Sequence, residues 1–291
     1  MRIAAYRHQG QLGVGRVSAD GLQVEPFQIS ADQAALGALP LVEAQVAGRA
    51  LPPTGQPIPL QQVQLTAPVP RPRRNIFCVG KNYHAHAKEF AGSGFDSSAK
   101  SGGDIPAAPI IFSKVPECVV GPTDNIAWTP EVSTAIDYEA ELTIVIGQGG
   151  KGISKADAMK HVWGYTIIND VTARDWQGRH SQWLLGKSFD TFCPMGPWLV
   201  SADECDGTKT QVKLWVNDEL RQDASTTDLI FDIPTLIECI SAGITLYPGD
   251  VIATGTPVGV GIGFKPPKYL KAGDVVKIEI GGIGVLENTL R

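Results

Sequence analysis

The sequence contains no pair of cysteines in CxxC spacing, and it has five cysteines in all. Because an odd, scattered set suits neither a structural zinc site nor a disulfide scaffold, we expect reduced thiols and a cytoplasmic location. No stretch approaches the roughly 20 apolar residues of a membrane-spanning helix. The first ten residues, MRIAAYRHQG, lack the apolar segment of a secretory signal. We therefore expect neither membrane insertion nor secretion.

The sequence also lacks an excess of positive charge. Lys and Arg number 25 against 30 Asp and Glu, which gives a net charge of −5. Since no basic stripe is visible, we expect no nucleic-acid partner. The 32 glycines and 21 prolines follow no period, so a collagen-like chain is excluded and a turn-rich, β-rich fold is favoured.

The first part of the chain consists of short, turn-rich segments. Strands are predicted at residues 2–6, 13–17 and 22–26, because Gly and Asp-Gly turns separate them. Three prolines at positions 68, 70 and 72 then interrupt any helix or central strand. We interpret this stretch as a linker that closes a small β-rich N-terminal domain, residues 1–70, before a larger domain, residues 71–291. A surface loop within one domain is the alternative.

Beyond the linker, predicted strands outnumber predicted helices. Helices are predicted at residues 83–90, 155–160 and 233–241. Strands are predicted at residues 75–80, 109–113, 139–146, 165–169, 198–200, 212–216, 250–253 and 275–280. Since strands and helices do not alternate regularly, the pattern favours a β-rich α+β fold over a Rossmann or TIM-barrel fold.

Glu139 and Glu141 form the most distinctive pair of charges. On a strand, residues two apart share a face, so both carboxylates point the same way within the otherwise apolar segment DYEAELTIVI. Two like charges on a buried face require a bound proton or a cation between them. A solvated acidic face on an edge strand explains the pair equally well.

Asp170 supplies a third carboxylate at the end of another apolar segment, YTIIND. If it converges with Glu139 and Glu141, the site offers three oxygen ligands and no nitrogen or sulfur. Such a set suits Mg²⁺ or Mn²⁺, with Ca²⁺ as a further candidate, better than zinc. About three of the six positions of Mg²⁺ would remain for water or substrate.

His86 and Glu89 lie three residues apart in a predicted helix and can therefore touch. A carboxylate beside an imidazole orients the ring and raises its basicity, so the pair could activate a water. A solvated helix face with a routine ion pair is the alternative. The Gly- and Ser-rich residues 91–108 that follow are either a slack insertion or an active-site lid.

Lys187 and the Gly-rich residues 249–261 are weaker signals. The lysine in LGKSFD could bind a carboxylate or stabilise an enolate, or its side chain could extend to solvent. The stretch GDVIATGTPVGVG has the composition of a backbone turn that holds an oxyanion, but it lacks the Gly-Lys-Ser/Thr of a P-loop. A tight β-turn explains it as well.

Four ordered motifs resemble those of the fumarylacetoacetate hydrolase (FAH) superfamily, from about Asn75 to the C-terminus. They are GKNYHAHAKE, DYEAEL, NDVTARDWQ with LGKSFDTFCPMGPW, and GDVIATGTPVGVG. The segments TFCPMGPW and YPGDVIATGTPVGVGIGFKPP are most similar to the FAH-domain-containing branch. The resemblance implies a mixed β-sandwich roll with a small β-rich N-terminal domain and a catalytic domain over residues 71–291. It also implies a homodimer.

The resemblance assigns the three acidic residues above as ligands of Mg²⁺ or Mn²⁺. His86 and Glu89 match a catalytic dyad on a lid that orders when substrate binds. His84 is a second candidate base, but the spacing of His86 to Glu89 is the one that matches. The lid segment is longer here than in the relatives.

Further roles follow from the same resemblance. Lys187 matches the active-site lysine, and Gln177 and Thr256 match positions that contact substrate. Arg174 matches a motif arginine that we expect to pair with a nearby acid. Lys81 stands where the relatives commonly have Arg, so the positive charge is kept and the bidentate fork is lost.

The resemblance implies an enzyme for small 2-oxo acids. Our leading hypothesis is hydrolysis of a C–C bond in a β-diketo acid such as an acylpyruvate, with His86 and Glu89 activating water and Lys187 stabilising the oxyanion. Tautomerisation or decarboxylation of an oxaloacetate-like diacid needs the same enolate but no attacking water, and is the second hypothesis. A non-catalytic metal-binding protein is the third.

Overall fold

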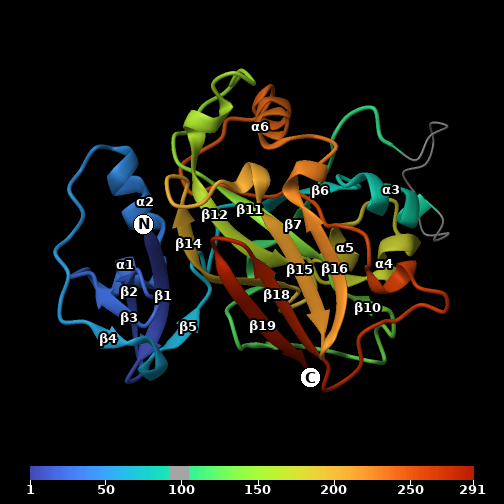
Figure 1. Ribbon diagram of the computed structural model, residues 1–291, viewed down its shortest axis with the longest axis horizontal. Coiled ribbons are helices and arrows are strands. Elements are labelled where there is room, and N and C mark those ends of the chain that lie inside the picture. Colours follow the sequence, from blue (N-terminus) through green and yellow to red (C-terminus); the bar gives the residue numbers. More distant parts are fainter. Residues whose placement is uncertain (92–104) are drawn as a thin grey trace.

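The computed structural model describes residues 1–91 and 105–291. The segment interpreted as a lid or a slack insertion lies mostly outside the described residues. Within the described chain, a 12-stranded mixed sheet runs through the molecule, and a five-stranded sheet packs on one of its faces (Figure 1). A two-stranded ribbon completes the β structure described. This architecture confirms the predicted β-rich α+β class.

The N-terminal part contains the three predicted strands and two helices that were not predicted. Its strands are β1 (Arg2–His8), β2 (Gln11–Val17), β3 (Gln23–Pro26), β4 (Ile58–Pro59) and β5 (Gln64–Thr66). Its helices are α1 (Ala31–Ala35) and α2 (Leu39–Val46). The Ser30 hydroxyl and the Gln33 side chain form a capping box at the start of α1, which a Ser-x-x-Gln spacing can indicate.

The N-terminal strands continue the large sheet. β1 pairs antiparallel with β14 (Cys193–Ser201), with Arg2 opposite Val200 and Ile3 opposite Leu199. The proline-containing residues 67–75 form neither helix nor strand. The division at residue 70 stays a prediction, because one sheet spans both sides of it.

The remaining strands complete the sheets. The large sheet adds β6 (Ile76–Gly80), β7 (Ile110–Lys114), β8 (Val119–Val120), β11 (Ala140–Ile146), β12 (Val162–Asn169) and β17 (Val251–Ala253). The five-stranded sheet holds β9 (Asn125–Ile126), β15 (Gln211–Val216), β16 (Glu219–Ser225), β18 (Val275–Ile280) and β19 (Gly284–Leu290). The ribbon pairs β10 (Ile136–Asp137) with β13 (Thr172–Ala173).

Short helices occupy the connections. The α-helices are α3 (His84–Ala91), α4 (Arg174–Arg179), α5 (Leu184–Lys187) and α6 (Ile233–Ser241). The 3₁₀ turns are η1 (Leu60–Gln62), η2 (Pro116–Cys118), η3 (Ala158–His161), η4 (Gly207–Lys209), η5 (Thr226–Asp228) and η6 (Gly261–Gly263). No described helix has the length and apolar character needed to cross a bilayer.

The prediction of a helix at residues 155–160 is wrong. The chain forms a turn there, followed by the 3₁₀ turn η3. The Ser154 hydroxyl donates to Asp157 Oδ2 at 2.8 Å, and β12 begins at Val162. The side-chain bond stabilises a local turn, and the strand leaves no room for a longer helix.

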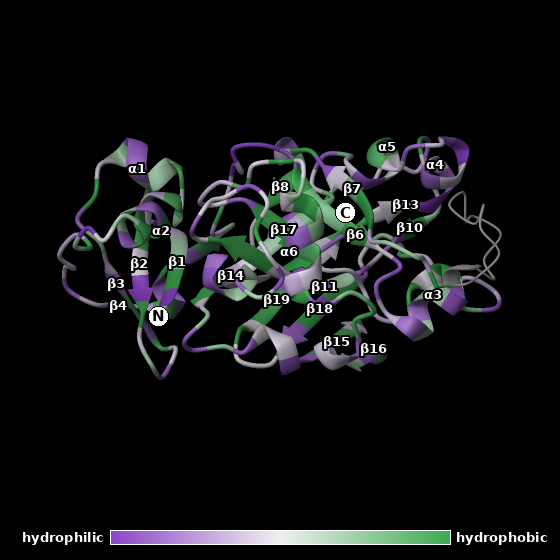
Figure 2. Ribbon diagram, turned by 90° about the horizontal axis from the view of Figure 1, so that it is seen from above, coloured by the Kyte–Doolittle hydropathy of each residue, from purple (hydrophilic) through white to green (hydrophobic). Residues whose placement is uncertain are grey.

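β11 is buried on both faces, because the large sheet is the middle layer. Leu142 and Ile144 belong to the core shared with Leu214 of the five-stranded sheet, whereas Val145 belongs to the core shared with Leu41 of α2. Figure 2 shows these central strands mostly in the hydrophobic colour. In both views α1 and α2 lie at one end of the molecule, and α3 and α4 lie at the other (Figures 1 and 2).

Candidate active site

Three acidic side chains meet where β11 begins and β12 ends. The two strands are antiparallel, with Ala140 opposite Asn169, and Asp170 N donates to the Glu139 carbonyl at 2.9 Å. One carboxylate oxygen from each of Glu139, Glu141 and Asp170 lies within 4.8 Å of the others, and all three residues are buried. The structure thus brings together the acids that the sequence suggested as metal ligands.

Two of these acids have positive partners. Lys187 Nζ lies 2.6 Å from Glu139 Oε2 and 2.8 Å from Asp170 Oδ2. Arg174 Nη2 lies 2.6 Å from Glu139 Oε1. Burial raises the pKa of Glu139, but the charges of Lys187 and Arg174 outweigh it and lower the pKa to about 2. Glu139 is therefore ionised at neutral pH.

Glu141 has no cationic partner within the described chain. Its Oε2 accepts a hydrogen bond from Gly255 N at 2.8 Å. Burial raises the pKa of Glu141 well above its usual range, and the neighbouring charges of Asp170 and Glu139 raise it further. Ionised Glu141 is thus a buried charge that needs a cation.

This arrangement fits a divalent cation. Three carboxylate oxygens without nitrogen or sulfur are the donors that Mg²⁺ and Mn²⁺ prefer. A cation near Glu141 would remove the cost of burying that charge. Glu139, Glu141 and Asp170 are therefore the residues that could hold one.

Lys114, at the end of β7, also touches this cluster and was not singled out from the sequence. Its side chain is fully buried. Its Nζ donates to Asp170 Oδ1 at 2.7 Å and to the carbonyl of Val171 at 3.1 Å, and it also reaches the Lys187 carbonyl. Burial lowers the pKa of Lys114, but Asp170 outweighs it and the net shift is upward. The sequence signal was a lone lysine that ends an apolar strand.

Arg174 holds the acids and the Gly-rich turn together. Its Nε lies 2.8 Å from Asp137 Oδ2, which confirms the expected pairing with an acid. Asp137 also accepts hydrogen bonds from Gly261 N at 2.6 Å and from Ile262 N at 3.0 Å. Arg174 Nη1 donates to Gln177 Oε1 at 3.0 Å. The same arginine therefore holds the side chains of Gln177 and Glu139.

The predicted dyad lies on α3. His86 Nδ1 lies 3.0 Å from Glu89 Oε2, and Gly259 N donates to Glu89 Oε1 at 3.0 Å. The Nδ1–H tautomer of His86 is the one that can donate to the Glu89 carboxylate, and in that tautomer Nε2 is the ring atom that can accept a proton. His86 is 4 % exposed and lines the pocket described next, whereas His84 is exposed on the same helix.

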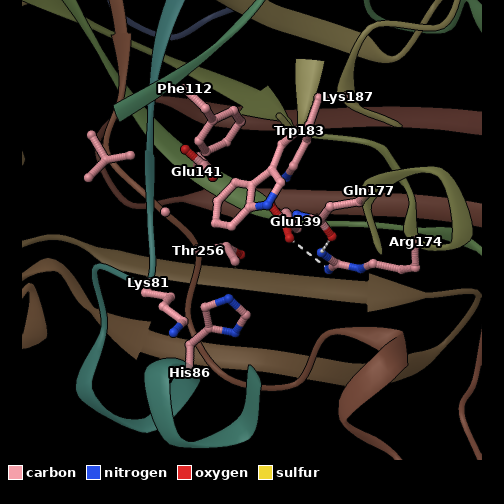
Figure 3. Close-up of a pocket in the computed structure, with 12 residues that line it drawn as sticks. Lys81, His86, Phe112, Glu139, Glu141, Arg174, Gln177, Trp183, Lys187 and Thr256 are labelled. Atoms are coloured by element: carbon pink, nitrogen blue, oxygen red, sulfur yellow. Dashed lines mark hydrogen bonds and ion pairs between the residues drawn. The ribbon is translucent and has the colours of Figure 1, made fainter. Parts of the chain in front are cut away.

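A pocket connects the dyad to the carboxylates. In Figure 3, Lys81 and His86 lie on one side of the pocket, and Phe112, Trp183 and Lys187 lie on the other. The pocket is lined by Val79, Gly80, Lys81, His86, Phe112, Glu139, Glu141, Arg174, Gln177, Trp183, Lys187 and Thr256. All predicted catalytic and substrate-contact residues except Glu89 therefore line one pocket.

An aromatic wall closes one side of this pocket. The rings of Phe112 and Trp183 pack edge to face, 5.2 Å apart, and Lys187 Nζ lies 4.9 Å from the Phe112 ring centre. A Cβ at Gly80 would lie 2.6 Å from the indole of Trp183, so the wall requires glycine there. Lys81 has a positive φ of 54°, a strained conformation for a non-glycine residue that often occurs at functional sites.

The family model described as "Fumarylacetoacetate (FAA) hydrolase C-terminal" matches residues 75–291. The chain belongs to the fumarylacetoacetate hydrolase family. This membership confirms the family resemblance and the FAH-type fold expected from the four motifs.

Individual relatives in the family are similar over most of their length. Oxaloacetate tautomerase YisK of Bacillus subtilis is 50% identical over 232 residues, which are 79% of this chain and 74% of YisK. The structure of a fumarylacetoacetate hydrolase from Exiguobacterium antarcticum is 39% identical with a TM-score of 0.82, covering 100% of this chain and 99% of that one. The structure of a maleylpyruvate hydrolase from Sphingobium sp. SYK-6 with manganese(II) and pyruvate is 32% identical, with a TM-score of 0.73, and the match covers 100% and 98% of the two chains.

Proposed function

We propose that this protein is a divalent-metal-dependent tautomerase that interconverts the enol and keto forms of oxaloacetate or a closely related 2-oxo diacid. The observation that carries the proposal is the 50% identity to an oxaloacetate tautomerase. The pocket agrees with it, because a proton-transfer dyad lies beside a carboxylate cluster suited to a metal. The leading hypothesis from the sequence, C–C bond hydrolysis, therefore gives way to the second one.

The wall of the pocket carries charges that suit an anionic substrate. Lys81, Lys187 and Arg174 place three cationic side chains in its wall. Lys187 and Arg174 offset the charges of the acids, so that a divalent cation at the acids would leave a positive site for a substrate with carboxylates.

Glu139, Glu141 and Asp170 would hold Mg²⁺ or Mn²⁺. When bound, the ion would supply a Lewis acid that stabilises negative charge on the substrate's 2-oxygen. Lys187, beside the same acids, adds a second positive charge there. Phe112 and Trp183 cover this side of the pocket and limit the entry of water, which strengthens these electrostatic contacts.

His86 would carry the proton. In the enol-to-keto direction the O–H bond at C2 breaks, the C2=C3 pair of electrons takes up a proton, and a C–H bond forms at C3. His86 Nε2 can exchange this proton, while the hydrogen bond between Nδ1 and Glu89 holds the ring in place. The reaction needs no attacking water and leaves every C–C bond intact.

Acylpyruvate hydrolysis is the second candidate function. The relative named maleylpyruvate hydrolase supports it, and so does the His86–Glu89 pair, which could activate a water held at Nε2. The two functions differ in whether a C–C bond breaks.

The test follows the ultraviolet absorbance of enol oxaloacetate after it is diluted into buffer with Mg²⁺, with and without EDTA. We expect the protein to accelerate the loss of the enol band, and EDTA to stop the acceleration. His86→Gln should lower kcat by about 100-fold or more, whereas His84→Gln on the exposed face of α3 should not. If oxaloacetate is unaffected while acetylpyruvate loses its band, the protein is a hydrolase.

A further inference from the structure

Gln222 connects the five-stranded sheet to both halves of the pocket. It lies on β16 and is 1 % exposed. Its Oε1 accepts from Ala140 N at 3.0 Å, and Ala140 lies between Glu139 and Glu141 in the sequence. Its Nε2 donates to Thr256 Oγ1 at 2.8 Å and to the Pro257 carbonyl at 2.7 Å.

Two backbone groups determine which way this amide faces. Ala140 N–H can only donate, so it must meet the amide oxygen of Gln222. The Pro257 carbonyl can only accept, so it must meet the amide nitrogen. The usual ambiguity between the oxygen and nitrogen of a glutamine is thus resolved by the contacts themselves.

The orientation of the amide determines whether the Thr256 hydroxyl accepts or donates a hydrogen bond in this contact. Because Nε2 donates to Thr256 Oγ1, that oxygen is an acceptor in this bond, and its own proton must point elsewhere. Thr256 is 2 % exposed and lines the pocket (Figure 3). Within the described residues no protein acceptor receives this proton. It is therefore available to an oxygen in the pocket.

We propose that Gln222 is a positioning residue that makes the Thr256 hydroxyl a hydrogen-bond donor to an anionic oxygen of a bound 2-oxo acid. The substrate class rests on the proposed function. Thr256 follows Gly255, whose N–H binds Glu141, so the donor lies next to the carboxylate cluster. Gln222 acts through Thr256 and does not touch the substrate.

Gln222→Glu tests whether Gln222 makes the Thr256 hydroxyl a hydrogen-bond donor to the substrate. A carboxylate at this position keeps an acceptor for Ala140 N but has no N–H for Thr256, so the hydroxyl turns to donate to the new carboxylate. We expect KM for oxaloacetate to rise about ten-fold or more, as for a lost hydrogen bond to a charged group. The loss should appear in KM more than in kcat.

Thr256→Val provides the matched background. It should raise KM by a similar factor, and adding Gln222→Glu should then change KM by less than about two-fold, because both variants remove the same bond. Thr256→Ser keeps the hydroxyl and should recover most of the affinity. A full effect of Gln222→Glu in the Thr256→Val protein would assign Gln222 a purely structural role and overturn the proposal.

Pyruvate binding separates this proposal from the proposed function. Calorimetric titration of the Mn²⁺-loaded protein with pyruvate measures recognition of a 2-oxo carboxylate without turnover. We expect Gln222→Glu and Thr256→Val to weaken pyruvate binding by the same factor, with Mn²⁺ affinity unchanged. Wild-type affinity in Gln222→Glu, or no binding of pyruvate to the wild type, would overturn the proposal.

A protein that binds pyruvate as expected but does not act on oxaloacetate refutes only the proposed function. If Gln222→Glu does not fold, Gln222→Met takes its place. It removes the N–H but offers the Thr256 hydroxyl no carboxylate, so pyruvate binding should weaken by a smaller factor, and wild-type affinity would again overturn the proposal.

Discussion

Glu141 is the acid of the cluster whose burial is not balanced by a cationic side chain in the described chain. Its pKa is raised in the metal-free folded state, so that state holds a proton that the unfolded chain releases. The free energy of unfolding of the metal-free protein therefore falls as the pH rises above about 4.5, the ordinary pKa of a glutamic acid. Below that pH Glu141 is protonated in both states, and its titration no longer lowers the free energy of unfolding.

Glu141→Gln removes this penalty. In EDTA at pH 7.5 we expect the variant to be more stable than the wild type by about 1–3 kcal/mol, the range for an unsatisfied buried group, and the difference should shrink towards pH 4.5. Mg²⁺ should stabilise the wild type, by about 2.7 kcal/mol at 100 times Kd, but not the variant. Urea unfolding at several pH values measures both effects. A destabilised variant without metal would contradict this account of Glu141.

Lys114 provides a second test at the residue scale. Lys114→Met leaves Asp170 buried with one of its two lysine partners, and removal of one partner from a buried pair costs about 3–5 kcal/mol. Lys155→Met removes an exposed ion pair to Asp232, whose side chains are 52% and 54% exposed, and should cost less than about 1 kcal/mol. If urea unfolding shows the same loss in the free energy of unfolding for both variants, the role assigned to buried Lys114 is contradicted.

The sequence predicted the acids of the site better than their partners. Glu139, Glu141 and Asp170 stand at strand ends within apolar runs, a local pattern that can be recognised. Lys114 and Gln222 act over 56 and 82 positions of sequence, on Asp170 and Ala140 respectively. A local pattern carries no information about such distant contacts, so these roles required the structure.

At the scale of elements, the contact between α3 and η6 holds the dyad in place. A Cβ at Gly263 would overlap the Glu89 carboxylate, which is the flexible end of its side chain. Gly263→Ala should therefore move Glu89 away from His86 without unfolding the protein. We expect kcat to fall about ten-fold or more, as for partial loss of general acid–base catalysis.

Gly243→Ala is the matched control, because a Cβ there meets no atom within 4 Å. It should change neither kcat nor the melting temperature. Steady-state kinetics and thermal unfolding of both variants decide the matter. Wild-type kcat in Gly263→Ala would show that the position of Glu89 is not important.

Among the helices, α3 and α6 were predicted, whereas the N-terminal helices α1 and α2 were missed. The helix at Ile233–Ser241 was predicted with its bounds as observed, because Asp232 caps it and its apolar positions recur at helical spacing. The five-residue α1 was missed despite its Ser30–Gln33 capping box. Residues 155–160 have a helical composition, but a side-chain bond and the start of β12 override it.

At the scale of the whole molecule, the N-terminal strands and the main sheet share a core. Ile3 and Leu41 belong to the same buried cluster as Val145 and Leu199. We therefore predict one cooperative unfolding transition in calorimetry for the full chain, and aggregation of a fragment of residues 71–291 because it exposes this cluster. Two separate transitions, or a soluble fragment that binds metal as the full chain does, would favour the two-domain division at residue 70. The homodimer and the cytoplasmic location stay predictions.

The central claim is that the protein moves a proton between the 2-oxygen and C3 without breaking a C–C bond. Proton NMR of enol oxaloacetate in D₂O with Mg²⁺ tests it most directly. The account predicts keto oxaloacetate with deuterium at C3, formed faster with the wild type than with His86→Gln, and no enzyme-dependent pyruvate. Enzyme-dependent pyruvate, or equal rates for the wild type and His86→Gln, would contradict it.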